Sequence, residues 1–575
     1  MAALPLIVKA GRAFDFPIPA GRLLFARILC GGATMGGATM GKAADEWWRG
    51  AVIYQIYPRS FQDDSGDGIG DLAGILRRLP HVASLGVDAI WISPVFPSPM
   101  ADMGYDVADY CDIDPVFGTL AEFDALVARA HALGLKVIID QVLSHSSDRH
   151  PWFENSRTGG DKSDWYVWAD ARPDGTPPNN WLSVFGGPAW EWDAGRRQYY
   201  LHNFLPSQPD LNYHSPAVQE AALAVLEFWL ARGVDGFRLD TVNYYTHDAT
   251  LRDNPPAADP EPDGRAPANT YDMQDHLHDK TQPANLVFLA RMRALLDRYP
   301  GRCLIGEVGE RDDRALAIMA DYTSGENHLH MAYSFAMLGP DYSPAHFRAC
   351  LEGFFAAAPD GWPSWSFSNH DVNRHVTRWA GHGTQNALAR QAVSVLASFE
   401  GTIGLYQAEE LGQTETELSY DELTDPPGLR FWPENKGRDG CRTPMVWDST
   451  PNAGFSRVKP WLPVKPPQAA HAVTLQEANP ASVLHHYRQM LAFRRNSPVL
   501  RRGTTRFLDL PAPILGFTRG EGAGSLTCLF NLSPDPTECT VAPGLIATGP
   551  LLAATHEGTT ATLGPNGCLW LTPAR

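Results

Sequence analysis

The body of this chain alternates short strand-like runs with helix-like stretches, and this alternation limits the possible fold more than any other feature. Eight runs rich in β-branched and aromatic residues lie at 51–58, 87–94, 136–142, 234–240, 303–308, 331–335, 364–370 and 402–407. Between them lie stretches such as 120–134, in which apolar residues recur at helical spacing. Strands that alternate with helices in this way are typical of an α/β fold, and eight of them predict a closed (β/α)8 barrel, a TIM barrel.

Two stretches break the alternation and predict further domains. Residues 144–212 are rich in Trp, Pro and Asn and too long for a simple loop, so we expect a small domain inserted after the third strand. Residues 501–575 combine short apolar runs with turn residues, which is typical of a small antiparallel β-sandwich. A helix predicted at 482–498 would close the barrel, which is expected to comprise residues 45–143 and 213–500.

The composition indicates a globular protein with an acidic surface. Of the 575 residues, 44% are hydrophobic and 19% are charged, and 47 Lys and Arg face 65 Asp and Glu, for a formal net charge of −18. This charge repels phosphate backbones and anionic lipids, which argues against nucleic-acid and membrane-surface partners. No apolar run reaches the roughly 18 residues that a transmembrane helix needs. The eight cysteines are scattered without a CxxC pair, which favours reduced thiols and a cytoplasmic location.

The first part of the chain differs in pattern from the rest. Residues 1–44 show no clear period and end in a Gly- and Ala-rich repeat, which predicts a flexible N-terminal extension. Basic residues precede a Leu-rich piece at 23–29, as in a secretory signal, but Arg27 interrupts it. A flexible tail, or a translation start at Met35 or Met40, is the favoured interpretation, and no chemistry is assigned to this part.

Charged side chains gather where the predicted strands end. The third, fourth, fifth and seventh strands end, in order, with Asp140 and His145, Arg238 and Asp240, Glu307, and His370 and Asp371. In a barrel of this kind the carboxyl ends of the strands meet at one mouth. Three carboxylates there suit a double displacement at a sugar carbon: one stays ionised beside an Arg and attacks, and another holds a proton for the leaving oxygen.

Five short motifs at and near these strand ends form a set. They are DQVLSH (140–145), QPDLN (208–212), GFRLDTVNY (236–244), IGEV (305–308) and SFSNHD (366–371). Together they resemble the signature regions of glycoside hydrolase family 13, the α-amylase family, in the form used by its oligo-1,6-glucosidase and α-glucosidase branch. The resemblance covers roughly residues 46–575 and implies a catalytic barrel, a B domain inserted after strand three and a C-terminal β domain.

The resemblance implies roles for the charged residues. Asp240 matches the nucleophile and Glu307 the general acid/base of the family. Asp371 matches the carboxylate that stabilises the distorted sugar and its oxocarbenium-like transition state. Arg238 matches the partner of the nucleophile, where a guanidinium would keep the carboxylate ionised. A retaining double displacement through a glucosyl-Asp240 intermediate is therefore expected.

The resemblance also implies a pocket for one terminal glucose. Tyr105, in the segment MADMGYDVADY, matches a Tyr that stacks on the glucose, and His145 and His370 match histidines that bond its hydroxyls. Asp102 and Arg438, the latter in GRDGCRTPM, would clamp the 4-hydroxyl end. A pocket closed in this way is expected of an exo-acting α-glucosidase rather than an endo-amylase.

Two further residues bear on the pocket wall and on the choice of bond. Phe185, in the inserted stretch, is expected to complete the wall, with an ordinary core position as the alternative. In this branch the residue after the nucleophile tends to be Val in enzymes that favour α-1,6 bonds and Thr in those that favour α-1,4 bonds. Here it is Thr241, so maltose-like α-1,4 substrates are expected.

An acidic loop after the first predicted strand indicates a cation site. In DDSGDGIGD, oxygen ligands stand at alternating positions, namely Asp63, Ser65, Asp67, the carbonyl of Ile69, and Asp71. Gly68 supplies a sharp turn, but the closing Glu of an EF-hand is missing. Hard oxygen ligands suit Ca²⁺ or Mg²⁺, and the resemblance implies a single structural Ca²⁺. A metal-free Asp/Gly turn is the alternative.

The leading hypothesis is thus a retaining exo-α-glucosidase, a monomer or homodimer, whose partners are short α-glucosides and sugar or alcohol acceptors. A dedicated α-glucosyltransferase using maltose or sucrose shares the same chemistry, because an acceptor can intercept the glucosyl-enzyme in place of water. A sucrose isomerase is disfavoured, because no Arg-Leu-Asp-Arg-like segment precedes the C-terminal domain. A non-catalytic, membrane-anchored relative is disfavoured because all three carboxylates are present and no anchor is visible.

Overall fold

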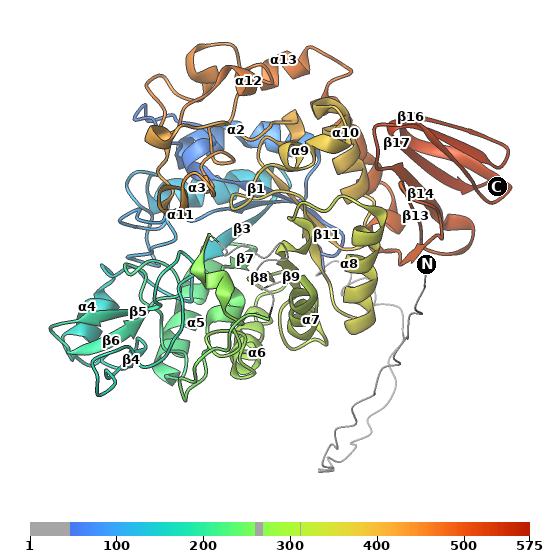
Figure 1. Cartoon of the computed structure of the whole chain (residues 1–575). Coiled ribbons are helices and arrows are strands. Elements are labelled where there is room, and N and C mark those ends of the chain that lie inside the picture. The colour runs from blue at the N-terminus through green and yellow to red at the C-terminus, as the bar shows by residue number, and fades with distance from the viewer. Residues whose placement is uncertain (1–45, 259–267, 311, 575) are drawn as a thin grey trace, which may run out of the picture. The chain divides into compact units, whose positions relative to one another are not determined.

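The computed structural model describes residues 46–258, 268–310 and 312–574 (Figure 1). The predicted N-terminal extension, residues 1–44, lies outside the described residues. Within the described chain, eight parallel strands form one sheet at the eight places that the sequence predicts.

The parallel strands close into a barrel. They are β1 (Val52–Ile56), β2 (Ala89–Ile92), β3 (Lys136–Gln141), β7 (Gly236–Leu239), β8 (Cys303–Val308), β9 (Met331–Ser334), β10 (Ser364–Ser366) and β11 (Thr402–Tyr406). Hydrogen bonds link them in the order β10-β11-β1-β2-β3-β7-β8-β9, and a parallel bridge between Ala332 and Pro363 joins the two ends. The predicted (β/α)8 barrel is confirmed.

Side chains along each strand alternate between the barrel interior and the surrounding layer. In β1, Ile53 packs in an inner cluster with Ile138 and Met331, whereas Val52 and Tyr54 belong to the large cluster shared with the helices. All residues of β1 are buried. Because both faces of the sheet are covered, its strands are nearly continuous apolar runs, which is the pattern that the sequence carries.

Helices cover the outside of the barrel. They are α2 (Leu72–Leu85), α3 (Leu120–Ala132), α5 (Pro216–Ala231), α6 (Ala284–Leu296), α7 (Asp312–Thr323), α8 (Pro344–Ala357), α10 (Gln385–Leu396) and α14 (Val483–Arg495). Polar caps fix where several of them begin. The Thr119 hydroxyl accepts the Glu122 N–H at the start of α3, and the Ser482 hydroxyl accepts the His485 N–H at the start of α14.

Between β3 and β7 the chain leaves the barrel and forms a small sheet of its own. Its elements are α4 (Pro151–Arg157), β4 (Trp168–Ala169), β5 (Trp190–Asp193) and β6 (Gln198–Leu201), with strand order β4-β6-β5. A separate core of Trp181, Trp190 and Leu201 holds these strands together. The Trp-rich composition of this stretch thus supplies its core.

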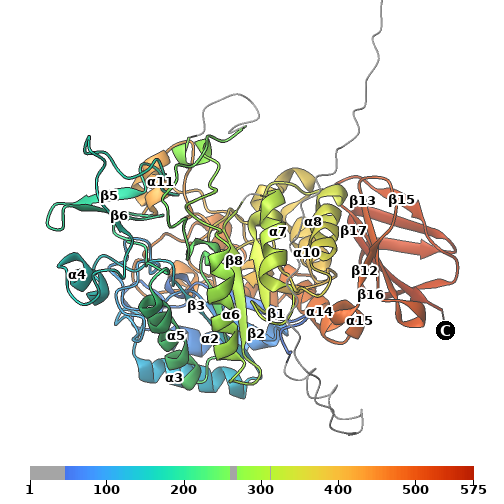
Figure 2. The same cartoon turned by 90° about the horizontal axis from the view of Figure 1, so that it is seen from below.

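The C-terminal part is an antiparallel sheet, as predicted for a β domain. Its strands are β12 (Thr505–Phe507), β13 (Ile514–Arg519), β14 (Leu526–Asn531), β15 (Thr537–Thr540), β16 (Leu545–Glu557) and β17 (Thr560–Pro573), which hydrogen bonds link into one sheet. Phe517 and Trp570 belong to the cluster shared with the barrel helices, whereas Ile514 and Leu569 form a second core. Figure 2 shows α8 and α10 beside this sheet, where they contact β13 and β17.

Short helices occupy the remaining connections. They are α9 (His375–Arg378), α11 (Pro426–Phe431), α12 (Pro466–Ala469), α13 (Val473–Glu477) and α15 (Pro498–Arg502). Across the described part of the chain, no helix has the length and apolar character needed to cross a membrane.

Candidate active site

A pocket of about 250 Å³ opens where the barrel strands end. All the residues predicted as catalytic or substrate-binding line it except Arg238, which is buried and contacts Asp240 and Glu307 of the lining. The predicted residues in the lining are Asp102, Tyr105, His145, Phe185, Asp240, Thr241, Glu307, His370, Asp371 and Arg438. Loops that are far apart in the sequence therefore bring these side chains to one cavity.

Three carboxylates share the guanidinium of Arg238. Its Nη1 lies 2.8 Å from Asp140 Oδ1 and 2.8 Å from Asp240 Oδ1. Its Nη2 lies 2.6 Å from Glu307 Oε2. The Tyr333 hydroxyl accepts a hydrogen bond from Arg238 Nε at 3.0 Å and donates one to Glu307 Oε1 at 2.9 Å. One cation is thus surrounded by more negative charge than it neutralises.

Burial changes the acidity of these carboxylates. It raises the pKa values of Glu307 and Asp240 to about 7 and that of Asp140 to about 6, although Arg238 opposes each shift. The neighbouring negative charges add to the shift. The cluster can therefore hold a proton near neutral pH.

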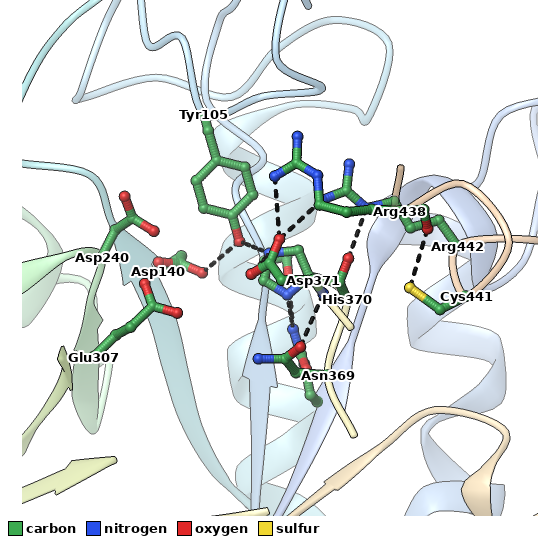
Figure 3. A network of polar contacts seen from close by, with 12 residues as sticks. Tyr105, Asp140, Asp240, Glu307, Asn369, His370, Asp371, Arg438, Cys441 and Arg442 are labelled. Carbon is green, nitrogen blue, oxygen red and sulfur yellow. Dashed lines mark hydrogen bonds and ion pairs between the residues drawn. The ribbon is translucent and has the colours of Figure 1, made fainter. Parts of the chain in front are cut away.

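Asp371 has a different environment, shown in Figure 3. Its Oδ1 lies 3.2 Å from Arg438 Nη1 and 3.0 Å from Arg442 Nη2, and its Oδ2 lies 3.3 Å from His370 Nε2. Burial alone would raise the pKa of Asp371, but its charged neighbours outweigh burial and hold that pKa below its usual range. We attribute the effect to the two guanidinium groups, since burial keeps the pKa of His370 well below its usual value. Asp371 stays ionised.

Tyr105 and the two predicted histidines are in contact with one another. The rings of Tyr105 and His370 stack with centroids 5.2 Å apart and planes at 11°. The Tyr105 hydroxyl lies 2.5 Å from His370 Nε2 and donates to Asp140 Oδ2 at 3.1 Å. His145 Nε2 lies 3.0 Å from the carbonyl of Tyr105, and its Nδ1 lies 2.9 Å from Ser144 Oγ. A sugar hydroxyl would therefore share or replace one of these partners.

An ion pair joins two residues of the pocket lining. Arg438 Nη2 lies 2.8 Å from Asp102 Oδ1, which brings together the two residues expected to form a clamp. Asp102 Oδ2 also accepts a hydrogen bond from Gln208 Nε2 at 3.1 Å. The Arg438 guanidinium lies 5.2 Å from the ring centroid of Phe185, so this Phe forms part of the wall.

Thr241 turns the chain directly after β7. Its φ of 36° lies in the left-handed region. The Thr241 N–H donates to Glu307 Oε2 at 3.1 Å, and its hydroxyl donates to Asp240 Oδ2 at 3.3 Å. This residue therefore connects the predicted nucleophile to the predicted acid.

The structure brings four residues without a predicted role to the site. Asp140 and Gln208 stand inside two of the quoted motifs, and Arg442 stands in GRDGCRTPM. Each of them contacts a predicted site residue. Tyr333 lies on the predicted strand at 331–335, but a single strand Tyr gives no signal that its hydroxyl reaches Glu307.

The predicted cation loop follows β1 and turns sharply at Gly68. This residue has a φ of +94°, and a Cβ there would lie 2.4 Å from the Lys459 carbonyl oxygen. Asp63 accepts hydrogen bonds from the Gly68 N–H and the Ser65 hydroxyl, and Asp71 accepts the Ser65 N–H. Within the described ranges no three His, Cys, Asp or Glu side chains gather as metal ligands. The oxygen donors suit Ca²⁺ chemically, but donors of the loop itself engage these carboxylates, so the cation site stays a prediction.

Comparisons with known proteins agree with this architecture. The family described as the alpha-amylase catalytic domain matches residues 55–503. A probable alpha-glucosidase from Rhizobium meliloti (strain 1021) is 59% identical over 497 residues, which cover 85% of this chain and 90% of that protein. An oligo-1,6-glucosidase from Heyndrickxia coagulans is 36% identical over 526 residues, which cover 85% of this chain and 92% of that protein.

A solved structure extends the comparison to three dimensions. The crystal structure of an alpha-glucosyl transfer enzyme, XgtA, matches with a TM-score of 0.88 and 51% identity, covering 92% of this chain and 99% of that chain. The family match covers the barrel, and the structural match, which covers 92% of this chain, extends beyond the barrel into the C-terminal sheet. The chain therefore belongs to glycoside hydrolase family 13, the α-amylase family, in its branch of α-glucosidases and oligo-1,6-glucosidases.

Proposed function

We propose that this chain is a retaining, exo-acting α-glucosidase that releases terminal glucose from maltose and short α-1,4-glucosides. One observation carries the proposal. Asp240, Glu307 and Asp371 line a single pocket, together with the ion pair between Asp102 and Arg438. In the proposal this pair closes the end of the pocket, which then admits the end of a chain and excludes its middle.

In this proposal Asp240 is the nucleophile. Arg238 Nη1 and the Thr241 hydroxyl both donate to the Asp240 carboxylate, which favours its ionised form. Arg238 also contacts Glu307, so one guanidinium holds both carboxylates close together. A close spacing, about 5 Å between the carboxyl groups, is typical of retaining glycosidases, whereas inverting enzymes need room for a water molecule.

Glu307 then acts as acid in the first step and as base in the second. Its raised pKa lets it hold a proton at neutral pH and deliver it to the leaving oxygen as Asp240 attacks the sugar carbon. The ionised Glu307 next deprotonates a water molecule, which releases α-glucose and frees Asp240. Asp371, held ionised by two arginines, would stabilise the positive charge that develops on the sugar ring.

A dedicated α-glucosyltransferase is the second candidate, and a specific feature favours it. A second cavity of about 400 Å³ adjoins the first, because Tyr244, Gly309 and Phe335 line both. A sugar or alcohol bound there would compete with water for the glucosyl-Asp240 intermediate. The similarity to a solved alpha-glucosyl transfer enzyme supports the same possibility.

A proton NMR time course on maltose separates the two candidates. For the hydrolase, α-glucose appears first and few new glucosidic signals follow. For the transferase, new oligosaccharide signals appear first and free glucose lags behind them. Release of β-glucose first would contradict the retaining mechanism, and no turnover of maltose, sucrose or isomaltose would contradict both candidates.

The cellular location belongs to the proposal as well. The cysteines within the described residues are all free, and most are buried. Free thiols are typical of a reducing compartment, so we propose a cytoplasmic enzyme.

A further inference from the structure

Arg438 contacts two carboxylates besides Asp102, its partner in the predicted clamp. Its Nη groups face Asp102 at 2.8 Å and Asp371 at 3.2 Å, both of which line the pocket. A third carboxylate, that of Asp425, lies 2.6 Å from Arg438 Nη2. Asp425 is fully buried and does not line the pocket, so it cannot touch a substrate in this arrangement.

Asp425 binds the edge of the guanidinium that carries Nε and Nη2. Arg438 Nε donates to Asp425 Oδ1 at 3.0 Å, and the backbone N–H of Arg438 donates to Asp425 Oδ2 at 2.8 Å. Contacts to Nε and Nη2 fix the plane of a guanidinium, because its donors form a rigid fork. The other N–H of Nη2 is left for Asp102, and Nη1 is left for Asp371.

Asp425 is itself held in place. It precedes α11, and the carboxylate of Asp439 accepts the backbone N–H groups of Asp425 at 2.8 Å and Thr424 at 2.5 Å. The turn leaves no room for a side chain at Gly437, where a Cβ would lie 2.5 Å from Asp425 Oδ2 and where φ is +71°. The chain from Thr424 to Asp439 is therefore built around the approach of Asp425 to Arg438.

The balance of charge around Arg438 also favours Asp425 as its partner. Arg438 and Arg442 face Asp102, Asp371 and Asp425, and Arg442 Nη1 lies 3.7 Å from Asp425 Oδ1. Burial would raise the pKa of Asp425, but Arg438 and Arg442 outweigh burial and lower it. Asp425 is thus an anion that partly neutralises Arg438, so that Asp102 and Asp371 need not do so alone.

We propose that Asp425 is the positioning residue for the clamp on the terminal glucose: it holds Arg438 in the orientation that presents its Nη groups to Asp102 and Asp371. The proposal rests on the proposed function, in which this end of the pocket binds a terminal glucose. It assigns Asp425 no contact with the sugar, and its effect on the reaction passes through Arg438.

The test compares kcat and KM of Asp425→Asn with those of the wild type on 4-nitrophenyl α-glucoside and maltose. The change keeps the shape of the side chain and removes its charge. Loss of a charge-assisted hydrogen bond predicts a fall in kcat/KM of about 10- to 100-fold, carried mainly by KM. Asp421→Asn, an exposed residue of the same connection, is the matched control and should leave both constants unchanged.

A double-mutant cycle distinguishes positioning from a general structural role. In an Arg438→Ala background, Asp425→Asn should change kcat/KM by less than about twofold, because its target is gone. A loss there as large as in the wild type would overturn the proposal, as would unchanged kinetics of Asp425→Asn alone. A wild-type enzyme inactive on both substrates would instead contradict the proposed function, and this inference with it.

Thermal unfolding checks that each variant folds. If Asp425→Asn does not fold, Asp439→Asn carries the same cycle, because it loosens the turn that holds Asp425 and keeps the charges of Asp425 and Arg438. Asp439→Asn is expected to raise KM, as is Asp425→Asn. Unchanged KM in a folded Asp439→Asn, or a loss that persists without Arg438, would count against the proposal.

Discussion

Replacing Tyr333 by Phe tests the assignment of the acid, because it removes one oxygen from a buried position next to Glu307. The Tyr333 hydroxyl donates to Glu307 Oε1 at 2.9 Å and accepts from Arg238 Nε at 3.0 Å. A donor stabilises the ionised carboxylate more than the protonated one, so Tyr333 lowers the pKa of Glu307 against the effect of burial. Without the hydroxyl, the pKa of Glu307 should rise above its value of about 7.

The size of the shift follows from the strength of the bond. A hydrogen bond to a charged group contributes about 1.5–3 kcal/mol, and about 1.4 kcal/mol corresponds to one pKa unit, so the shift should be roughly 1–2 units upward. The general acid must carry its proton, so activity is lost as pH rises through the pKa of Glu307. The alkaline limb of kcat/KM should therefore move to higher pH in Tyr333→Phe, while activity at the optimum falls because Arg238 Nε loses its acceptor.

The assay is the pH profile of kcat/KM on an aryl α-glucoside. Tyr322→Phe is the matched control, since this hydroxyl bonds to Asn285 Nδ2 at 2.9 Å and touches none of the carboxylates. The control should lose some thermal stability and keep the wild-type profile. An alkaline limb that stays in place in Tyr333→Phe, or moves equally in both variants, would refute the reasoning that Glu307 is the acid under the influence of Tyr333.

Three further outcomes are expected. Asp240→Ala should abolish turnover and keep the wild-type fold, as checked by activity and circular dichroism; an active variant would remove Asp240 as the nucleophile. Thr241→Val removes the hydroxyl that donates to Asp240, so kcat on maltose should fall several-fold. Preference should also move towards isomaltose. An unchanged ratio of kcat/KM on maltose to kcat/KM on isomaltose would reject residue 241 as the determinant of bond choice. If the loop at Asp63 binds Ca²⁺, chelation of the ion should lower the melting temperature of the wild type, and added Ca²⁺ should restore it. The melting temperature of Asp63→Ala should not respond to Ca²⁺. A wild-type melting temperature that does not change with Ca²⁺ would favour the metal-free turn.

Much of the fold could be predicted because the barrel strands are buried on both sides. Runs such as AIWI in β2 stay apolar along their length, and this signal does not depend on distant parts of the chain. The individual strands of the small sheet in the inserted stretch could not be predicted. Its β4 consists of Trp168–Ala169 alone, and a pair of residues carries no period.

The residues of the site also divide into those that the sequence predicts and those that it does not. Asp240 and Glu307 could be predicted to meet because each lies where a strand ends, and the topology of a barrel brings strand ends together; both line the pocket. Asp425 was not found, because it lies on no strand and meets Arg438 only through the folding of the long connection after β11. Arg442 stands within a quoted motif, but its contact with Asp371 depends on that same connection.

The two sides of the pocket differ in the balance of charge, and this difference places the proton on the Arg238 side. On one side Asp140, Asp240 and Glu307 surround the single guanidinium of Arg238, so full ionisation would leave buried negative charge uncompensated. On the other side two guanidinium groups face Asp371, and a proton there would cost both ion pairs. The acid must therefore come from the Arg238 side. Because Asp140 is fully buried and absent from the pocket lining, the choice falls between Asp240 and Glu307, and the family resemblance gives the role of the acid to Glu307.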